Sequence, residues 1–334
     1  MLRKMIRSEA LPLLEYDYQF NFMFNDVCNM QCPYCMAKRF ESDEDLKHNK
    51  HYYEKLLEVL SFCEDNSNVF SFSMGGEPLI SYKKFLSFIE DYLKIAKKKN
   101  INVTIETPTS LSLKNSDFES FLIGIHNLQN SVKPNINFRY KILASYHYLS
   151  PIKDLTNFIK NVLSAKKFGY LNTINVLLDP HYLKEIEHDF NLIKKITNHS
   201  RIYYVPIILE KEDGKDLHYG EKFERYLENR MFKLKQTYSD GSEEVRQKDI
   251  IYKNEFNAFK GWNCDLKNYC VINVDGNAYH CSAGLNHFDG IYDKPFHNIL
   301  VDDNSKFWEK TKVRKCKWDH CTCEVYRTKW LDAE

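Results

Sequence analysis

The sequence lacks both an excess of charge of one sign and any long hydrophobic run. Its 334 residues contain 47 lysines and arginines against 46 aspartates and glutamates, a formal net charge of +1. This balance gives no support for a protein dedicated to a nucleic acid or a charged membrane surface, although a local basic patch is compatible with it. No apolar run approaches the roughly 20 residues of a membrane-spanning helix, and the first residues lack the hydrophobic region of a signal peptide. We therefore expect a cytoplasmic protein that does not bind a membrane.

The ten cysteines are unevenly distributed along the chain. Three lie within residues 28–35, Cys63 stands alone, and six fall within residues 264–323. Because cytosolic thiols stay reduced, such groups are better interpreted as metal ligands than as disulfides. Cys63 is expected to be a small buried residue on a helix.

Six extended apolar segments alternate with helix-spaced segments over most of the chain. Strands are expected at 16–25, 69–74, 101–106, 136–144, 171–178 and 202–209, and helices at 43–63, 81–99, 115–128, 154–168, 181–197 and 220–236. Because this alternation has no hairpin signals, it predicts an α/β fold with a parallel sheet. Right-handed crossovers would curl six such units into an open, partial TIM-like (βα)6 barrel.

The composition changes near residue 245. Residues 237–258 are polar and are interpreted as a linker, and residues 1–15 as a short lead-in. After the linker come cysteines, aromatic residues and short strands. We therefore predict two domains, a barrel at 1–244 and a small cysteine-rich domain at 245–334.

Cys28, Cys32 and Cys35 are spaced C-x3-C-x2-C directly after the first predicted strand, in a segment we call the cysteine loop (residues 28–35). Thiolates in a short loop suit an iron–sulfur cluster. Three thiolates on a four-iron cluster leave one iron open, and an open coordination position distinguishes a reactive metal site from a structural one. A zinc knuckle or three unrelated cysteines would be the alternatives.

Gly75, Gly76, Glu77 and Pro78, which we call the diglycine segment, directly follow the second predicted strand. Two glycines allow the backbone to approach a ligand closely and to adopt positive φ angles, and the Glu77 carboxylate would add a charge-assisted hydrogen bond. Strand ends of parallel barrels share one rim, so we expect this segment beside the cysteine loop. The alternative is an ordinary turn in which Pro78 starts a helix.

The cysteine loop, with Tyr34 before its last cysteine, and the diglycine segment about forty residues later resemble the signature of the radical S-adenosylmethionine (SAM) superfamily. The resemblance implies a [4Fe–4S] cluster on the three cysteines, whose open iron chelates SAM through its methionyl amine and carboxylate. An electron from the cluster then cleaves SAM to a 5′-deoxyadenosyl radical, which abstracts hydrogen from a substrate. It also implies a reducing partner such as flavodoxin or ferredoxin.

The same resemblance assigns further SAM contacts. The diglycine segment would bind the methionyl amine, Tyr34 would lie near the adenine, and Ser145 and His147 would contact ribose or carboxylate. A loop or capping role would explain His147 equally well. The family's glycine-rich motif after the fifth strand is replaced here by Leu177, Leu178 and Asp179. Three strand-end residues are candidate substrate contacts by position: Glu106, Thr107 and Asp179.

The C-terminal cysteines suggest a second metal site. Asp275-Gly276 between two alternating runs predicts a type I′ hairpin that places Cys270 opposite Cys281, with Cβ atoms about 4.5–5.5 Å apart. Two such thiols would share one metal centre, and Cys264 would reach in from the preceding loop. A fourth ligand would come from Cys316, Cys321 or Cys323. A structural zinc ribbon is the alternative.

Cys264, Gly276 and Cys281 resemble the auxiliary-cluster region of the SPASM/twitch branch of that superfamily, which includes sulfatase-maturating and peptide-modifying enzymes. The full SPASM tail is C-x2-C-x5-C-x3-C, whereas this chain has C-x4-C-x-C at residues 316–323. Six cysteines cannot supply eight ligands for two clusters. We therefore expect one auxiliary [4Fe–4S] cluster, and a second cluster that is partly held by residues other than cysteine is the alternative.

The leading interpretation is an enzyme that abstracts hydrogen from an unactivated carbon of a peptide, an amino acid or another small substrate. A second interpretation is modification of a nucleotide or nucleic-acid base by the same chemistry. The net charge of +1 disfavours a large polyanion but not a nucleotide. A third is an iron–sulfur or zinc protein that acts as an electron carrier or scaffold. No residue is assigned as general acid or base.

Overall fold

A nine-stranded sheet forms the centre of the described part of the chain, in the order β13-β12-β11-β2-β3-β4-β5-β6-β7. Strands β2 to β7 are mutually parallel. They are β2 (Tyr18–Met23), β3 (Asn68–Met74), β4 (Asn102–Thr109), β5 (Phe138–Tyr146), β6 (Leu171–Leu178) and β7 (Ile202–Pro206). The computed structural model describes residues 3–8, 16–25, 27–32, 50–206, 233–247, 259–281, 294–317 and 328–331.

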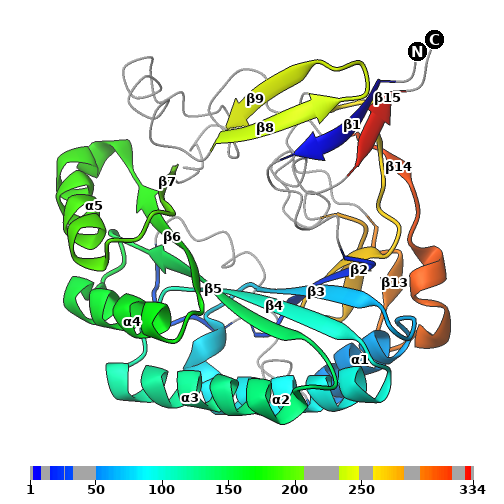
Figure 1. Ribbon diagram of the computed structural model, residues 1–334, viewed down its shortest axis with the longest axis horizontal. Coiled ribbons are helices and arrows are strands. Elements are labelled where there is room, and N and C mark those ends of the chain that lie inside the picture. The colour runs from blue at the N-terminus through cyan, green and yellow to red at the C-terminus, as the bar shows by residue number, and fades with distance from the viewer. Residues whose placement is uncertain are drawn as a thin grey trace.

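Five described α-helices cover the outer side of this curved sheet (Figure 1). They are α1 (Lys50–Ser61), α2 (Tyr82–Lys98), α3 (Asn115–Val132), α4 (Leu155–Lys167) and α5 (Leu183–Thr197). Short 3-10 helices are η4 (Pro78–Ser81), η5 (Pro180–Tyr182), η6 (Asn304–Lys306) and η7 (Trp308–Lys310). Six parallel strands with helices on their outer side are the predicted partial (βα)6 barrel, so the α/β fold class is confirmed. No described helix is long and apolar enough to cross a membrane.

Alternate residues of the strands build the core between the sheet and the helices. Phe22 of β2 lies 5.4 Å from Phe88 of α2, between ring centroids, and Phe24 lies 4.7 Å from Phe85. Side chains alternate between the two faces of a strand, so this set points to the helices. Burial of each ring contributes about 1.5–3 kcal/mol. The apolar stripe predicted for residues 81–99 is the face of α2 that packs on the sheet.

Strand β5 shows which side chains line the inside of the barrel. Its even-numbered residues, from Phe138 to Tyr146, are buried against the helices. Lys141, Leu143 and Ser145 alternate with them and are only half-buried. They therefore lie on the inner face, which leaves Ser145 near the end of the strand, where the rim of the barrel begins.

The polar segment interpreted as a linker forms a β-hairpin instead. β8 (Lys233–Tyr238) pairs antiparallel with β9 (Glu243–Gln247), and Gly241 in the turn has a φ of +81°. Polar turn residues, rather than a linker, explain the composition. The end of the helix predicted at 220–236 lies in β8, which corrects that prediction, and its earlier part lies outside the described residues. The predicted domain boundary at 244/245 falls inside β9, and the two-domain division stays a prediction.

The lead-in also contains a strand, β1 (Arg3–Ser8), which lies between β8 and β15 (Lys329–Leu331) in a second sheet. This sheet continues through β10 (Asn263–Cys264) to β14 (Arg314–Lys315). The two ends of the chain therefore lie side by side (Figure 1). The main sheet is extended beyond β2 by β11 (Tyr269–Ile272), β12 (Asn277–Tyr279) and β13 (His297–Asn298).

Candidate active site

The cysteine loop follows β2 at the C-terminal end of the parallel strands. The backbone N–H of Met30 donates to Cys28 Sγ at 3.4 Å, and Cys32 Sγ lies 3.4 Å from Nδ1 of His147. Cys28 is half-buried and Cys32 is 4% exposed. Cys35 and Tyr34 lie outside the described residues.

The segment after β5 holds this loop in place. Ser150 Oγ donates to the carbonyl oxygen of Met30, and the backbone N–H of Ser150 donates to the carbonyl of His147 at 3.2 Å. Burial lowers the pKa of His147 to about 4, so the imidazole is neutral at pH 7. The structure places His147 beside a cysteine of the loop, and its contact with SAM stays a prediction. Ser150 was missed, because nothing in its local sequence indicates a partner 120 residues away.

The diglycine segment packs on the end of β2 and on Asn25 and Val27, which lead into the cysteine loop, as the shared rim predicts. The N–H of Glu77 donates to the carbonyl oxygen of Val27 at 2.8 Å. Gly76 has a φ of +50°, and a Cβ there would lie 2.6 Å from the carbonyl oxygen of Asn25. Gly75 has a φ of +75°, and a Cβ would overlap the Met23 side chain. Gly76 therefore needs glycine for conformation and for space, whereas Gly75 needs it for its positive φ, because the end of the Met23 side chain can move aside.

The carboxylate of Glu77 is fully engaged inside the protein. Oε1 accepts from Thr109 Oγ1 at 2.7 Å and from the N–H of Leu79 at 3.2 Å. Oε2 accepts from the N–H of Ser110 at 2.6 Å and from its hydroxyl group. A carboxylate has about four lone-pair sites, so the acceptor capacity is filled. Burial raises the pKa of Glu77, and these hydrogen bonds oppose that shift.

This geometry gives Glu77 a structural role, because it caps η4 and ties the end of β3 to the end of β4. Thr109 and Ser110 are its partners, and neither was predicted from the sequence. The sequence signal that could have indicated them is a pair of hydroxyl residues at the end of β4, the strand beside the one that leads into the diglycine segment.

Asn25 provides an observation that tests whether the site fits SAM. Its side chain is 2% exposed, and Oδ1 has no hydrogen-bond partner among the described residues. This oxygen lies against Gly76, and Nδ2 donates to the carbonyl oxygen of Glu77 at 3.5 Å. A buried acceptor without a donor costs about 1–3 kcal/mol unless a ligand supplies the donor. An ammonium group at the diglycine segment would do so, and the nearby thiols suit iron, so the residues fit both cofactors.

Two of the three positional substrate candidates have structural roles instead. Thr107 is 0% exposed and lies on the same face of β4 as the core residues Val103 and Ile105, which face the helices, so it does not reach the inner face. Asp179 caps η5, where Oδ1 accepts from the N–H of His181 at 2.8 Å. Glu106 accepts from Asn172 Nδ2 at 2.9 Å, which spans β4 and β6 inside the barrel. Glu106 alone of the three stays a candidate.

The C-terminal hairpin has a different register from the predicted one. Val271 pairs with Tyr279, which places Cys270 opposite residue 280 rather than Cys281. The loop has three residues, with Gly276 at a φ of +76°, instead of the two of a type I′ turn. A shift of one residue turns a side chain to the other face of a strand. Cys270 accordingly belongs to the core shared with the helices, and its predicted pairing with Cys281 is wrong.

Three other cysteines do come together. Cys264 and Cys281 share a buried cluster with Tyr269, and Cys316 packs against it. We call these three cysteines the C-terminal cysteine group. Met74, the last residue of β3, also packs on this cluster, so the group lies beside the strand that leads into the diglycine segment. Cys321 and Cys323 lie outside the described residues.

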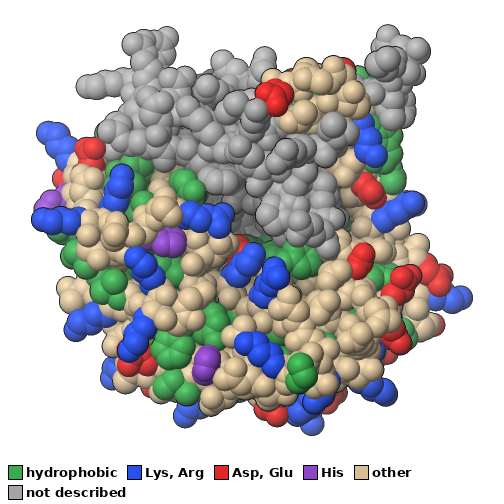
Figure 2. All heavy atoms as spheres, viewed as in Figure 1, with side chains coloured by type: hydrophobic (Ala, Val, Ile, Leu, Met, Phe, Trp, Pro, Cys, Tyr) green, Lys and Arg blue, Asp and Glu red, His purple; other side chains and the backbone are tan. Residues whose placement is uncertain are grey.

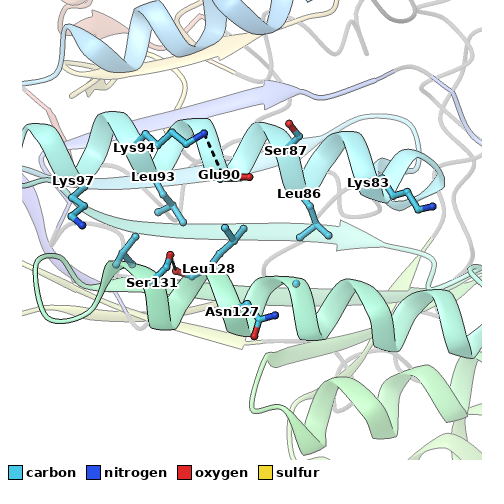
Figure 3. Close-up of a pocket in the computed structure, with 12 residues that line it drawn as sticks. Lys83, Leu86, Ser87, Glu90, Leu93, Lys94, Lys97, Asn127, Leu128 and Ser131 are labelled. Carbon is cyan, nitrogen blue, oxygen red and sulfur yellow. Dashed lines mark hydrogen bonds and ion pairs between the residues drawn. The ribbon is translucent and has the colours of Figure 1, made fainter.

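These thiols are gathered but do not already form a metal site. In the described ranges, no three His, Cys, Asp or Glu side chains are placed to hold one metal ion. A groove of about 640 Å³ lies elsewhere, between the outer sides of α2 and α3 (Figure 3). It is lined by Leu86, Leu93 and Leu128 among lysines, and none of the predicted site residues faces it.

Comparison with known families matches residues 23–193, just over half of the chain, to the radical SAM superfamily. Among solved structures, the chain is similar to native anSMEcpe with bound AdoMet and Kp18Cys peptide, at 14% identity and a TM-score of 0.53, covering 87% of this chain and 81% of that one. Native anSMEcpe with bound AdoMet and Cp18Cys peptide gives 15% identity and a TM-score of 0.51, covering 92% and 90%. At these identities the likeness concerns the fold. A comparison with curated proteins found no match.

Proposed function

The chain belongs to the radical SAM superfamily, and from this premise we propose that it abstracts hydrogen from an unactivated carbon of a peptide, an amino acid or another small substrate. Enzymes of this superfamily use a [4Fe–4S] cluster, SAM and a reductant. The observation that carries the proposal is the hydrogen bond from the Glu77 N–H to the Val27 carbonyl, because it joins the residue directly before the cysteine loop to the diglycine segment.

Cys28, Cys32 and Cys35 would hold the cluster and leave its fourth iron to SAM. A bound cluster would supply the electron for the reductive cleavage of SAM that is typical of this superfamily. The residues of the chain would hold the cluster and orient SAM. The backbone of Gly75 and Gly76 would approach the methionyl end closely, since neither residue has a side chain there.

The methionyl ammonium would find its acceptor in Asn25 Oδ1, which is buried beside Gly76 and otherwise without a donor among the described residues. Glu77 would support the SAM site without touching SAM, because its hydrogen bond from Ser110 fixes the ends of β3 and β4 relative to each other. Ser145 lies on the inner face of β5, which suits a contact to the ribose or carboxylate. Tyr34 stays the proposed neighbour of the adenine.

A peptide or small substrate is supported by the fold. The anSMEcpe structures of similar fold were solved with peptides bound. The half-buried inner face of β5 provides side chains that a substrate would contact inside the barrel. Lys and Arg side chains on the described part of the face in Figure 2 are scattered among other side chains rather than gathered in one patch, which does not favour a nucleic acid.

The C-terminal cysteine group would hold the auxiliary [4Fe–4S] cluster of a small domain at residues 245–334. Cys264, Cys281 and Cys316 already share one buried environment, and Cys321 or Cys323 would supply the fourth thiolate. Met74 packs on the buried cluster that contains Cys264 and Cys281, which supports a position of this group near the proposed SAM site. A cluster there would accept an electron from the substrate or contact it directly. Cys270 has no part in this site.

Anaerobic reconstitution with iron and sulfide, followed by incubation with SAM and dithionite, tests the proposal. We expect 5′-deoxyadenosine to form in the wild type, and flavodoxin or ferredoxin to replace dithionite as reductant. Cys28→Ala is the control, because it removes one cluster ligand. Wild-type protein that forms no more 5′-deoxyadenosine than this control would eliminate every enzymatic interpretation and leave an electron carrier or scaffold.

A further inference from the structure

We propose that His147 donates an N–H···S hydrogen bond to the Cys32 thiolate that holds the cluster, and so raises the reduction potential of that cluster. The inference rests on the proposed function, because it requires Cys32 to be an iron ligand. It gives His147 a role that differs from contact with SAM. His147 would be a positioning residue that acts on the cluster through Cys32.

The geometry for this bond is present. Nδ1 of His147 lies 3.4 Å from Cys32 Sγ, a distance suited to a hydrogen bond with sulfur. A thiolate that binds iron has no proton of its own, so it accepts and the imidazole must donate. The imidazole therefore carries its proton on Nδ1 when the cluster is bound. Cys32 is 4% exposed, so water does not readily replace this donor.

Both partners are held from several sides. His147 directly follows β5, where the ring of Tyr146 packs 5.1 Å from Phe158 and its hydroxyl group donates to Asp189 at 2.6 Å. Ser150 links the two segments, because its N–H donates to the carbonyl of His147 and its hydroxyl to the carbonyl of Met30. The backbone that carries the donor and the backbone near the sulfur are thus anchored by contacts other than the bond between His147 and Cys32.

The second described thiol of the cysteine loop has an equivalent donor. The N–H of Met30 lies 3.4 Å from Cys28 Sγ. Reduction adds a negative charge to an iron–sulfur cluster, and hydrogen bonds to its sulfurs stabilise that charge. Each such bond therefore moves the reduction potential upward. The bond to Cys28 comes from the backbone and is not removed by changing a side chain alone, whereas the bond to Cys32 comes from a side chain.

The first test compares two substitutions of His147 by side chains of similar size. His147→Leu removes the donor, and His147→Asn keeps one, because the amide nitrogen of Asn lies where Nδ1 lies in His. Each reconstituted protein is titrated with dithionite without SAM and followed by electron paramagnetic resonance, with Cys28→Ala marking the auxiliary signal. We expect a more negative potential in His147→Leu and a potential near the wild-type value in His147→Asn. An unchanged potential in His147→Leu would overturn the inference.

The second test uses the wild-type protein, so it does not depend on a variant that folds. Protein labelled with ¹⁵N only in histidine is reduced, and hyperfine spectroscopy of the SAM-site cluster is recorded. We expect a weak ¹⁵N coupling in the wild-type spectrum, and its loss in a folded His147→Asn variant would assign it to His147. No coupling would overturn the inference, and so would the strong coupling of an imidazole bound directly to iron. Protein that cleaves SAM but shows no coupling defeats this inference alone, whereas protein that assembles no cluster at Cys32 defeats the proposed function as well.

Discussion

The backbone N–H of Glu77 donates a 2.8 Å hydrogen bond to the carbonyl oxygen of Val27, so two strand ends that are fifty residues apart in the sequence are joined at the site. The bond sits between the residues that would hold iron and those that would hold SAM. Its geometry depends on Gly76, whose φ of +50° allows the chain to pass close to Asn25 and Val27. Substitutions here should therefore separate cofactor binding from overall folding.

Gly76→Ala should abolish or strongly weaken SAM binding, by tenfold or more, because its Cβ would lie 2.6 Å from the Asn25 carbonyl oxygen and 2.8 Å from that of Val27. Calorimetric titration of SAM into reconstituted protein measures this. Gly169→Ala is a matched control, since Gly169 has a φ of +78° with open space around it. It should lose only about 1 kcal/mol of stability from backbone strain. Equal loss of SAM binding in both variants would contradict the prediction.

Asn25→Leu should separate affinity from stability. The change removes a buried oxygen that has no hydrogen-bond donor among the described residues, so the free energy of unfolding should fall by less than about 1 kcal/mol or rise. Affinity for SAM should fall at least tenfold, because the ammonium loses its acceptor. Denaturant unfolding and calorimetric titration give the two quantities. A large loss of stability with unchanged affinity would show that Asn25 only supports the fold.

Glu77→Gln should change how stability depends on pH. The folded-state pKa of Glu77 is raised above the ordinary value of 4.5 by burial, so between these two pKa values the folded state binds more protons than the unfolded one. The contribution of Glu77 is thus largest at low pH and decreases as pH rises through this window. Glutamine does not titrate, and it should also cost about 1–2 kcal/mol, because its amide group cannot accept from both Leu79 and Thr109 as well as from Ser110.

Measuring the free energy of unfolding of both proteins from the ordinary pKa up to neutral pH tests this. The free energy of unfolding of the wild type minus that of Glu77→Gln should become less positive with rising pH. A difference that stays flat or grows would mean that the hydrogen bonds to the carboxylate outweigh its burial.

Cys281→Ala should lower the iron content of reconstituted protein by about half, since one of two four-iron clusters would be lost. At least some SAM cleavage should remain, because the cysteine loop is intact. Cys270→Ala and Cys63→Ala are controls, as both thiols are buried outside the C-terminal cysteine group. Both should keep full iron. If Cys281→Ala lost zinc instead of iron, the group would be a structural zinc site.

The barrel was predictable because its periodicity is strong. Predicted strands alternate along the chain with predicted helices that have one apolar stripe. Their bounds agree with the structure to within a few residues, as for the helix predicted at 81–99. The hairpin at Asp275-Gly276 was less predictable, since both a two-residue and a three-residue loop use a glycine with positive φ. The observed pairing differs from the predicted one by a single residue, and this shift decides which face of the strand Cys270 occupies.

Much of the support around the site was not predictable, because it joins residues far apart in the sequence. Ser150 bonds to Met30, and Ser110 bonds to Glu77, across 120 and 33 residues. Serine has no periodic signal that would indicate such partners. The polar turn between β8 and β9 was misread for a related reason, because composition alone does not distinguish a linker from a hairpin turn.

The position of β1 has a consequence for how the chain assembles. β1 is synthesised before the other described strands, yet its two neighbours in the sheet, β8 and β15, follow more than 200 and 300 residues later. The parallel strands β2 to β7 emerge in between, with each neighbour following the last. On the ribosome the parallel strands can therefore form the barrel before β1 has either of its neighbours in the sheet. The C-terminal cysteines would then be added to a barrel that is already folded.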